Sequence, residues 1–158
     1  MAKVTFKMLL KRPACFLAYG FGSGLAPKAP GTFGTLVAIP IYFLMQGLSL
    51  GSYLALTCFG FIVGIWLCQR AADWLQKDDP SEIVWDEVIG YLVTMAAAPI
   101  AWWWCIVGFV LFRIFDIAKP WPVSLADKKL HGGFGIMLDD VIAGIYALIA
   151  LQLIAYSL

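Results

Sequence analysis

Charge is scarce in this chain of 158 residues. Only 13% of the residues are charged, 62% are hydrophobic and the mean hydropathy is +0.86. A soluble domain of this length needs roughly a quarter of charged residues to cover its surface. Two stretches, 29–69 and 88–112, contain no charged residue at all. The composition therefore argues against an ordinary soluble domain and predicts one small polytopic membrane domain over residues 1–158.

Histidine and the common catalytic motifs are also missing. His131 is the only histidine, and the four cysteines show no paired metal-ligand spacing, which argues against a zinc site. The chain contains no G-x-x-x-x-G-K-[ST], G-x-G-x-x-G or G-x-S-x-G motif, so nucleotide binding and serine hydrolysis lack their signatures. It also lacks the cysteine–arginine spacing of cysteine phosphatases and the Asp-x-Asp motif of haloacid-dehalogenase-type phosphatases. A single histidine cannot provide the two histidines of lipid phosphatases that form a phosphohistidine. Of the hydrolytic mechanisms, metal-assisted attack by water remains.

The uncharged stretches predict membrane-crossing helices. The first is long enough for two spans of about 20 residues, which we place at 33–46 and 53–69 with a turn at 47–52. The stretch 83–112 is too long for one upright span, and a hairpin turning at 99–102 keeps the flanking basic residues on one side, as the positive-inside rule requires. With a last span at 141–156, the expected fold is an all-α, polytopic helical membrane protein with about four to five membrane-embedded helices.

Several carboxylates lie at the edges of these apolar stretches, where membrane proteins rarely keep an acid without a use. They are Asp86, Glu87, Asp116, Asp139 and Asp140. In the hairpin topology all five lie near the cytoplasmic edge and can meet in one site. Such hard oxygen ligands suit Mg²⁺. The alternative is that each acid caps a helix N-terminus, worth about 0.3 to 1 kcal/mol. For Asp139 and Asp140, helix capping and metal binding explain the sequence equally well. Capping does not explain Asp116, because this residue is near a predicted helix C-terminus, where the helix dipole opposes a negative charge.

Two further segments look suited to an anion. In the glycine-rich segment 21–35, the glycines admit close backbone approach, and Thr32 or Thr35 can cap the first span. Backbone amides at such a helix start suit phosphate. A structural re-entrant loop explains the same glycines equally well. In the second segment, Arg113, Asp116 and Lys119 recur at three-residue spacing on one helical side. Taken alone, Arg113 and Lys119 would be interfacial anchors.

Four motifs occur in order along the chain. They are GSG at 22–24 with PGTFGT at 30–35, IVWDEVIG at 83–90, FRIFDIAKPWP at 112–122, and HGGFGIMLDDVIAG at 131–144. Together they resemble the bacterial phosphatidylglycerophosphatase A family over about residues 15–150. The resemblance implies an all-helical, Mg²⁺-dependent phosphatase of the bacterial inner membrane, multi-pass, with its active site facing the cytoplasm. The implied reaction converts phosphatidylglycerophosphate to phosphatidylglycerol and phosphate.

The expected site combines the acids with the anion-binding segments. We expect Asp86, Glu87, Asp116, Asp139 and Asp140 to bind one or two Mg²⁺ ions, with one acid left as the general base. Lys119 and Arg113 are expected to neutralise the phosphate, while Ser23 and Thr32 orient it. Lys28, in the glycine-rich segment, and His131, at the start of the last motif, complete the expected substrate-binding set.

Two other functions use similar residues. A transferase that joins an alcohol to a nucleotide-activated lipid would need two closely spaced aspartate triads, which are absent. An ion-coupled transporter would place its acids near the membrane midplane, whereas these lie at the predicted edge. The resemblance implies a phospholipid, phosphatidylglycerophosphate, as the substrate. The composition adds the bilayer as a partner, and no nucleic acid is expected.

Overall fold

The computed structural model describes residues 4–121, 123 and 131–157, and its elements are helical throughout these ranges. They are α1 (Phe6–Leu10), α2 (Pro13–Ala18), the 3-10 helix η1 (Gly20–Leu25), α3 (Pro30–Met45), α4 (Leu50–Leu75), α5 (Trp85–Thr94), α6 (Trp102–Ala118) and α8 (Gly132–Ser157). The described residues contain no strand. The predicted all-α class is therefore confirmed.

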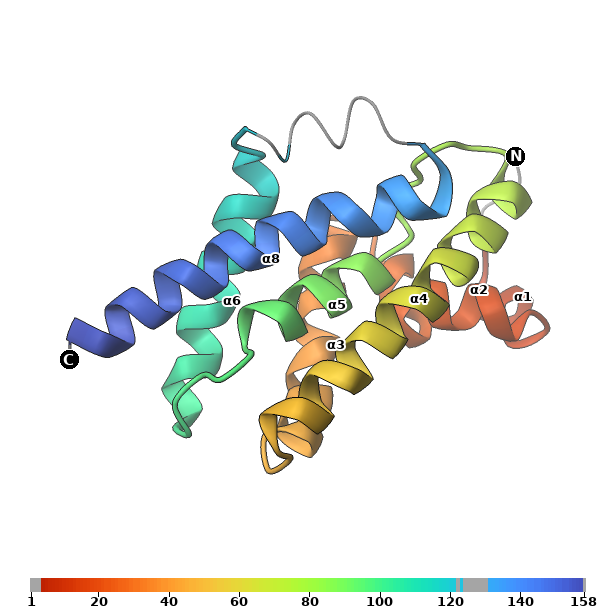
Figure 1. Cartoon of the computed structure of the whole chain (residues 1–158). Coiled ribbons are helices and arrows are strands. Elements are labelled where there is room, and N and C mark those ends of the chain that lie inside the picture. The colour runs from red at the N-terminus through yellow and green to blue at the C-terminus, as the bar shows by residue number, and fades with distance from the viewer. Residues whose placement is uncertain (1–3, 122, 124–130, 158) are drawn as a thin grey trace.

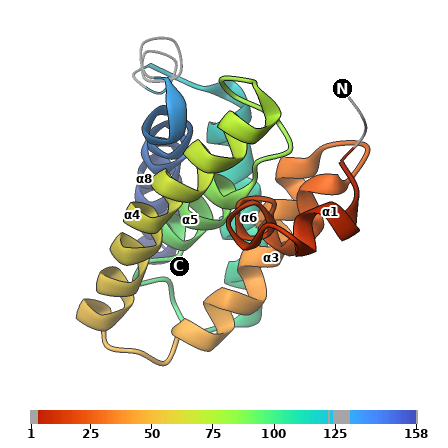
Figure 2. The ribbon, with the colours of Figure 1, turned by 90° about the vertical axis from the view of Figure 1, so that its right-hand side faces the viewer.

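Helix α5 lies in the middle of the bundle, with α8 along one side and α3, α4 and α6 around it (Figures 1 and 2). Two glycines allow α5 and α8 to touch through their backbones. A Cβ atom on Gly144 would lie 2.5 Å from the carbonyl oxygen of Gly90, and one on Gly90 would lie 2.8 Å from that of Asp140. Small residues permit such close helix crossings. This crossing brings the start of α5 beside the acidic pair of α8.

The predicted turns lie close to where the structure has them. Helix α3 ends at Met45 and α4 begins at Leu50, capped by Ser49, whose hydroxyl accepts a hydrogen bond from the Ser52 amide at 3.2 Å. A loop also separates α5, which ends at Thr94, from α6, which begins at Trp102, and this loop includes the start of the predicted turn at 99–102. The last helix differs, because it begins at 132 and not at 141. Asp139 and Asp140 therefore lie inside α8, and capping does not explain them.

The number of candidate membrane spans is smaller than predicted. Within the described residues, only α4 and α8 are both long and apolar enough to cross a bilayer. Helix α5 has ten residues, about 15 Å of helix against a hydrocarbon core of about 30 Å, and six of its residues are buried. Hydropathy alone cannot separate a helix that faces lipid from one that packs inside the bundle. The prediction of four to five membrane-embedded helices was therefore too high. The basic residues that flank the stretch 83–112, which set the predicted orientation, include Lys128 and Lys129, and these two lie outside the described residues.

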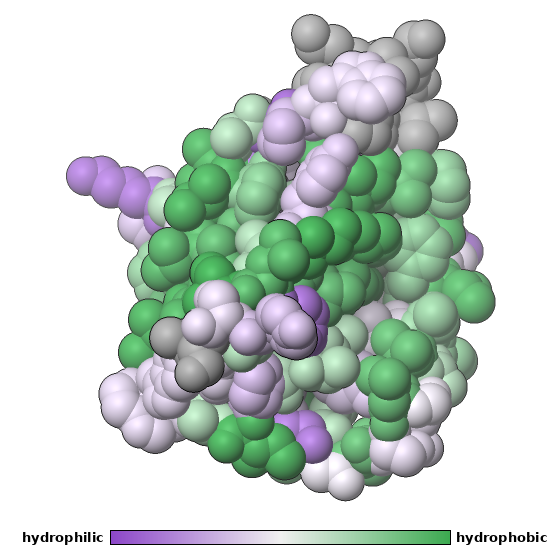
Figure 3. Space-filling model, turned by 60° about the vertical axis from the view of Figure 1, so that its left-hand side comes forward, coloured by the Kyte–Doolittle hydropathy of each residue, from purple (hydrophilic) through white to green (hydrophobic). Residues whose placement is uncertain are grey.

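Large hydrophobic side chains cover much of the outer surface. On α4, Phe59 and Ile62 are each 65% exposed and Trp66 is 54% exposed. Figure 3 shows a hydrophobic area across the middle of one face, with polar side chains gathered toward its two ends. Soluble monomers rarely expose apolar patches of such extent. Together with the two long apolar helices, this surface suggests that the chain associates with a membrane.

Candidate active site

Most of the predicted site residues line one cavity, of about 330 Å³. Seven of them line it: Asp86, Glu87, Arg113, Asp116, Lys119, Asp139 and Asp140. Asp86 and Glu87 lie in the first turn of α5, Asp116 lies in the last turn of α6, and the acidic pair comes from α8. Residues that are far apart in the sequence therefore meet because these three helices pack against one another.

Three of the acids form a tight group. One carboxylate oxygen from each of Asp86, Glu87 and Asp140 lies within 4.8 Å of the other two. Each residue also has a buried oxygen, Oδ1 of Asp86, Oε2 of Glu87 and Oδ2 of Asp140, without a hydrogen-bond partner in the described part of the chain. Leaving carboxylate oxygens bare and buried costs several kcal/mol. A divalent cation bound by the three clustered carboxylates would offset their buried charge, and an all-oxygen donor set suits Mg²⁺. The residues present therefore fit the metal that the sequence suggested.

Burial and neighbouring negative charges raise the pKa values of the two acids of α5, Asp86 and Glu87. Burial, followed by the charge of Asp140, raises the pKa of Glu87 to about 8. Burial and the neighbouring Glu87 raise the pKa of Asp86 well above its usual range. One carboxylate oxygen of Asp86 lies within 4.8 Å of one of Glu87, so each charge disfavours the other. Both shifts favour the protonated carboxyl groups over the ionised ones when no cation is bound.

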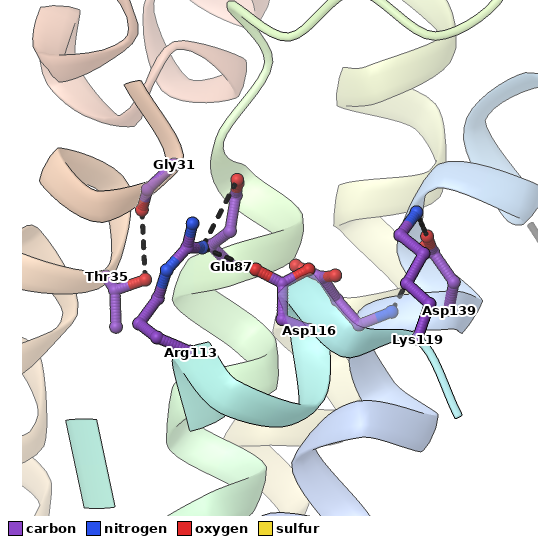
Figure 4. A network of polar contacts seen from close by, with 8 residues as sticks. Gly31, Thr35, Glu87, Arg113, Asp116, Lys119 and Asp139 are labelled. Carbon is purple, nitrogen blue, oxygen red and sulfur yellow. Dashed lines mark hydrogen bonds and ion pairs between the residues drawn. The ribbon is translucent and has the colours of Figure 1, made fainter. Parts of the chain in front are cut away.

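The remaining acids are paired with basic side chains, as Figure 4 shows. Arg113 donates a hydrogen bond to Asp116 one turn along α6, and its Nη1 lies 4.0 Å from Oε1 of Glu87. Lys119 Nζ donates to Oδ2 of Asp139 at 2.8 Å. The Arg113 side chain is 16% exposed and that of Lys119 is 31% exposed. Arg113 therefore contacts two of the acids from a mostly buried position, whereas Lys119 lies nearer to the solvent.

The start of α3 closes another side of the cavity. Ala29 has a left-handed backbone (φ 49°) and turns the chain so that the helix begins at Pro30. A Cβ atom on Gly31 would lie 2.1 Å from Oε1 of Glu87, so only glycine lets the backbone approach this carboxylate. Thr35 donates to the Gly31 carbonyl at 2.9 Å and holds the turn. The partial positive charge of this helix N-terminus thus faces the acidic group.

Four of the predicted substrate-binding residues lie outside this cavity. Ser23 donates to the Tyr19 carbonyl at 3.4 Å, within η1, and Lys28 is exposed. Thr32 is half-buried, and its backbone amide bonds to the Ala29 carbonyl. His131 lines a separate cavity of about 40 Å³. Of the glycine-rich segment, only 29–31 reaches the acids, because 20–25 folds as a separate 3-10 turn beside α2.

The sequence analysis missed Asp79. This residue lines both the acidic cavity and the small cavity of His131. Its charge adds to the pKa of Asp86, after the larger effects of burial and Glu87. The signal available in the sequence was the acidic turn Asp78–Asp79–Pro80, a few residues before the motif at 83–90. Because a loop before a helix start can fold back over it, an acid at that spacing could have been included.

Known proteins resemble this chain over nearly its whole length. The family model for phosphatidylglycerophosphatase A matches residues 16–155. A phosphatidylglycerophosphatase A of Escherichia coli is 45% identical, covering 92% of this chain and 84% of its own length. That of Haemophilus influenzae is 43% identical, covering 95% and 93%. A Bacteroides thetaiotaomicron protein, named as a candidate phosphatidylinositol-3-phosphatase, is 40% identical, covering 89% and 94%.

No solved structure matches the chain. The family match includes the four sequence motifs and all the acids of the cavity. The geometry of the site, the order of the motifs and the extent of the match agree, and the chain belongs to the phosphatidylglycerophosphatase A family.

Proposed function

We propose that this chain is an Mg²⁺-dependent phosphatase that hydrolyses the terminal phosphate of phosphatidylglycerophosphate at the cytoplasmic face of the bacterial inner membrane. The observation that carries the chemistry is the group Asp86, Glu87 and Asp140. One carboxylate oxygen of each lies within 4.8 Å of the other two, and each residue also has a buried oxygen without a partner among the described residues. The lipid substrate is the one named for the relatives of Escherichia coli and Haemophilus influenzae.

The three clustered acids would hold the metal, and the other charged residues would handle the phosphate and the water. A bound Mg²⁺ would polarise the phosphoryl group and neutralise its charge. Lys119, which lines the cavity and is the more exposed of the two cations, would contact a phosphate oxygen. Arg113 keeps Glu87 and Asp116 in position, since its contacts are to these carboxylates. Asp116 or Asp139 then receives the proton of the attacking water.

The outer surface supports the proposed membrane setting. A lipid substrate must reach the cavity from a bilayer, and the exposed hydrophobic residues of α4 and α8 would lie in that bilayer. The acids lie toward one end of α8, seven and eight residues after its start, and not at its middle. This position favours a phosphatase working at the interface over an ion-coupled transporter with a midplane site.

Phosphate release tests the proposal. The protein, purified in detergent, is mixed with phosphatidylglycerophosphate in the presence of Mg²⁺ or of a chelator. We expect inorganic phosphate and phosphatidylglycerol with Mg²⁺, and none with the chelator. Release that continues unchanged in the chelator would contradict the metal dependence, and no release under either condition would contradict the reaction itself.

A further inference from the structure

A second cavity, of about 370 Å³, adjoins the acidic one. Its wall includes Tyr19, Lys77 and Glu82, and it shares Pro30 and Ser81 with the acidic cavity. We call it the Tyr19–Glu82 cavity. Its polar groups come from the end of α2 and from the loop between α4 and α5. A ligand held in the acidic cavity therefore has a second polar chamber beside it.

Two buried oxygens at this cavity lack partners. Tyr19 is fully buried, and neither its Oη nor Oε2 of Glu82 has a hydrogen-bond partner in the described part of the chain. Every other buried side-chain atom without a partner in those ranges belongs to Asp86, Glu87, Arg113 or Asp140. Each such group costs about 1–3 kcal/mol unless something binds it. The residues that carry unpaired polar atoms in those ranges therefore all line one of the two adjoining cavities.

The chemistry of these two groups selects the ligand. Burial, and then the Glu82 charge, raise the pKa of Tyr19, so its phenol stays protonated and can donate. The Glu82 carboxylate only accepts when ionised, and Lys77 lies 3.3 Å from its other oxygen, Oε1. An alcohol matches both groups, because it donates one hydrogen bond and accepts another. A phosphate would meet the negative charge of Glu82, and an amine would meet the positive charge of Lys77.

We propose that the Tyr19–Glu82 cavity binds the hydroxyl group of the alcohol that carries the scissile phosphate, with Glu82 accepting from it and Tyr19 donating to it. This inference rests on the proposed function. In phosphatidylglycerophosphate, the glycerol between the two phosphates has one unesterified hydroxyl, on the carbon next to the one that bears the terminal phosphate. The shared wall of Pro30 and Ser81 would let the phosphate lie against the acids while this hydroxyl reaches the second cavity.

The test pairs one substrate change with one protein change. The substrates are phosphatidylglycerophosphate and an analogue in which propane-1,3-diol replaces the bridging glycerol, so that only the hydroxyl is lost. For the wild type, we expect kcat/KM to be at least about tenfold lower for the analogue, because a site built to bond a hydroxyl rejects a substrate that lacks it. Tyr19→Phe should lower kcat/KM for the natural substrate and leave that for the analogue unchanged. Glu82→Gln should reduce the same preference.

Two controls separate this role from a structural one. Tyr42→Phe removes the hydroxyl of another buried tyrosine, which lines a different cavity, and should preserve the wild-type preference. Thermal unfolding shows whether Tyr19→Phe remains folded, which we expect because the ring is kept. Equal wild-type rates on both substrates would overturn the inference while leaving the proposed function intact. An equal loss on both substrates in Tyr19→Phe would also overturn it. A wild type that cleaves neither substrate would refute the proposed function, and the inference with it.

Discussion

Replacing Glu87 by glutamine should stabilise the metal-free protein, although it removes a proposed metal ligand. With no cation bound, burial raises the pKa of Glu87 to about 8, against 4.5 for an unperturbed glutamate. Its ionised form is therefore disfavoured in the folded chain. A raised carboxyl pKa contributes stability that is fully present below pH 4.5 and is lost as the pH rises toward 8. Glutamine carries no charge and removes this dependence.

The size of the effect follows from the two pKa values. Between pH 4.5 and pH 7, Glu87 ionises in the unfolded chain but stays mostly protonated in the folded one. Each pH unit in this range lowers the free energy of unfolding by about 1.4 kcal/mol, or by about 3 kcal/mol in total. For a chain of this length, that loss lowers the unfolding temperature by roughly 6 to 12 °C. Mg²⁺ should reverse it in the wild type, because it binds the ionised site.

The assay is thermal unfolding in detergent at pH 4.5, 7 and 8, with chelator or with Mg²⁺. In chelator, Glu87→Gln should unfold above the wild type at pH 8 and close to it at pH 4.5, and Mg²⁺ should stabilise the wild type more than the variant. Asp73→Asn is the matched control, since Asp73 is exposed and bonds to Gln69 away from the site, so its pH profile should follow the wild type. Identical pH profiles for Glu87→Gln and the wild type would refute the reasoning.

Three further predictions concern the phosphate, the close approach of α3 and the topology. Lys119→Arg should fold normally yet lose most phosphatase activity, because the planar guanidinium does not reproduce a compact ammonium; wild-type turnover would return Lys119 to an anchoring role. Gly31→Ala should lower activity at least about tenfold, since a displacement of about 1 Å at an active site can cost more than that. Gly51→Ala is the control and should be neutral, because a Cβ atom there has no atom within 4 Å. Equal activities of the two variants would contradict the close approach of Gly31 to Glu87. Single cysteines at Ser49 and Ala101 should be labelled from the same, outer side of the membrane, and labelling from opposite sides would contradict the hairpin.

The turns and most helix positions could be predicted from the sequence, and the depth of each helix could not. Pro99 and the tryptophans that follow it mark the end of one helical segment and the start of another, and the structure has its loop there. Helix α5 reads as a membrane span because every residue from Val88 to Thr94 is uncharged. It is in fact enclosed by neighbouring helices, and burial against protein or against lipid selects the same residue types.

For the site, the residue types could be predicted from the sequence, and the contacts between them could not. The acids and the two cations stood out because charges are rare beside apolar stretches, and the structure brings seven of these residues to one cavity. The pairing was not visible: nothing in the sequence joins Lys119 to Asp139, since that contact depends on how α6 meets α8. Ser23 and Lys28 were included because glycine-rich segments suit phosphate, but glycine serves equally well in the tight 3-10 turn that Ser23 occupies.

The central claim is that Asp86, Glu87 and Asp140 hold one catalytic cation between them. Its most direct test is to titrate Mn²⁺, a paramagnetic substitute for Mg²⁺, into the purified protein, and to follow bound ion by electron paramagnetic resonance and phosphate release in the same samples. We predict that Mg²⁺ displaces the bound Mn²⁺, and that Asp86→Asn and Asp140→Asn each weaken binding and lower turnover at least about 100-fold, since ligands that act as a unit are strongly non-additive. Unchanged Mn²⁺ binding in both variants, or full turnover without any divalent ion, would contradict the account.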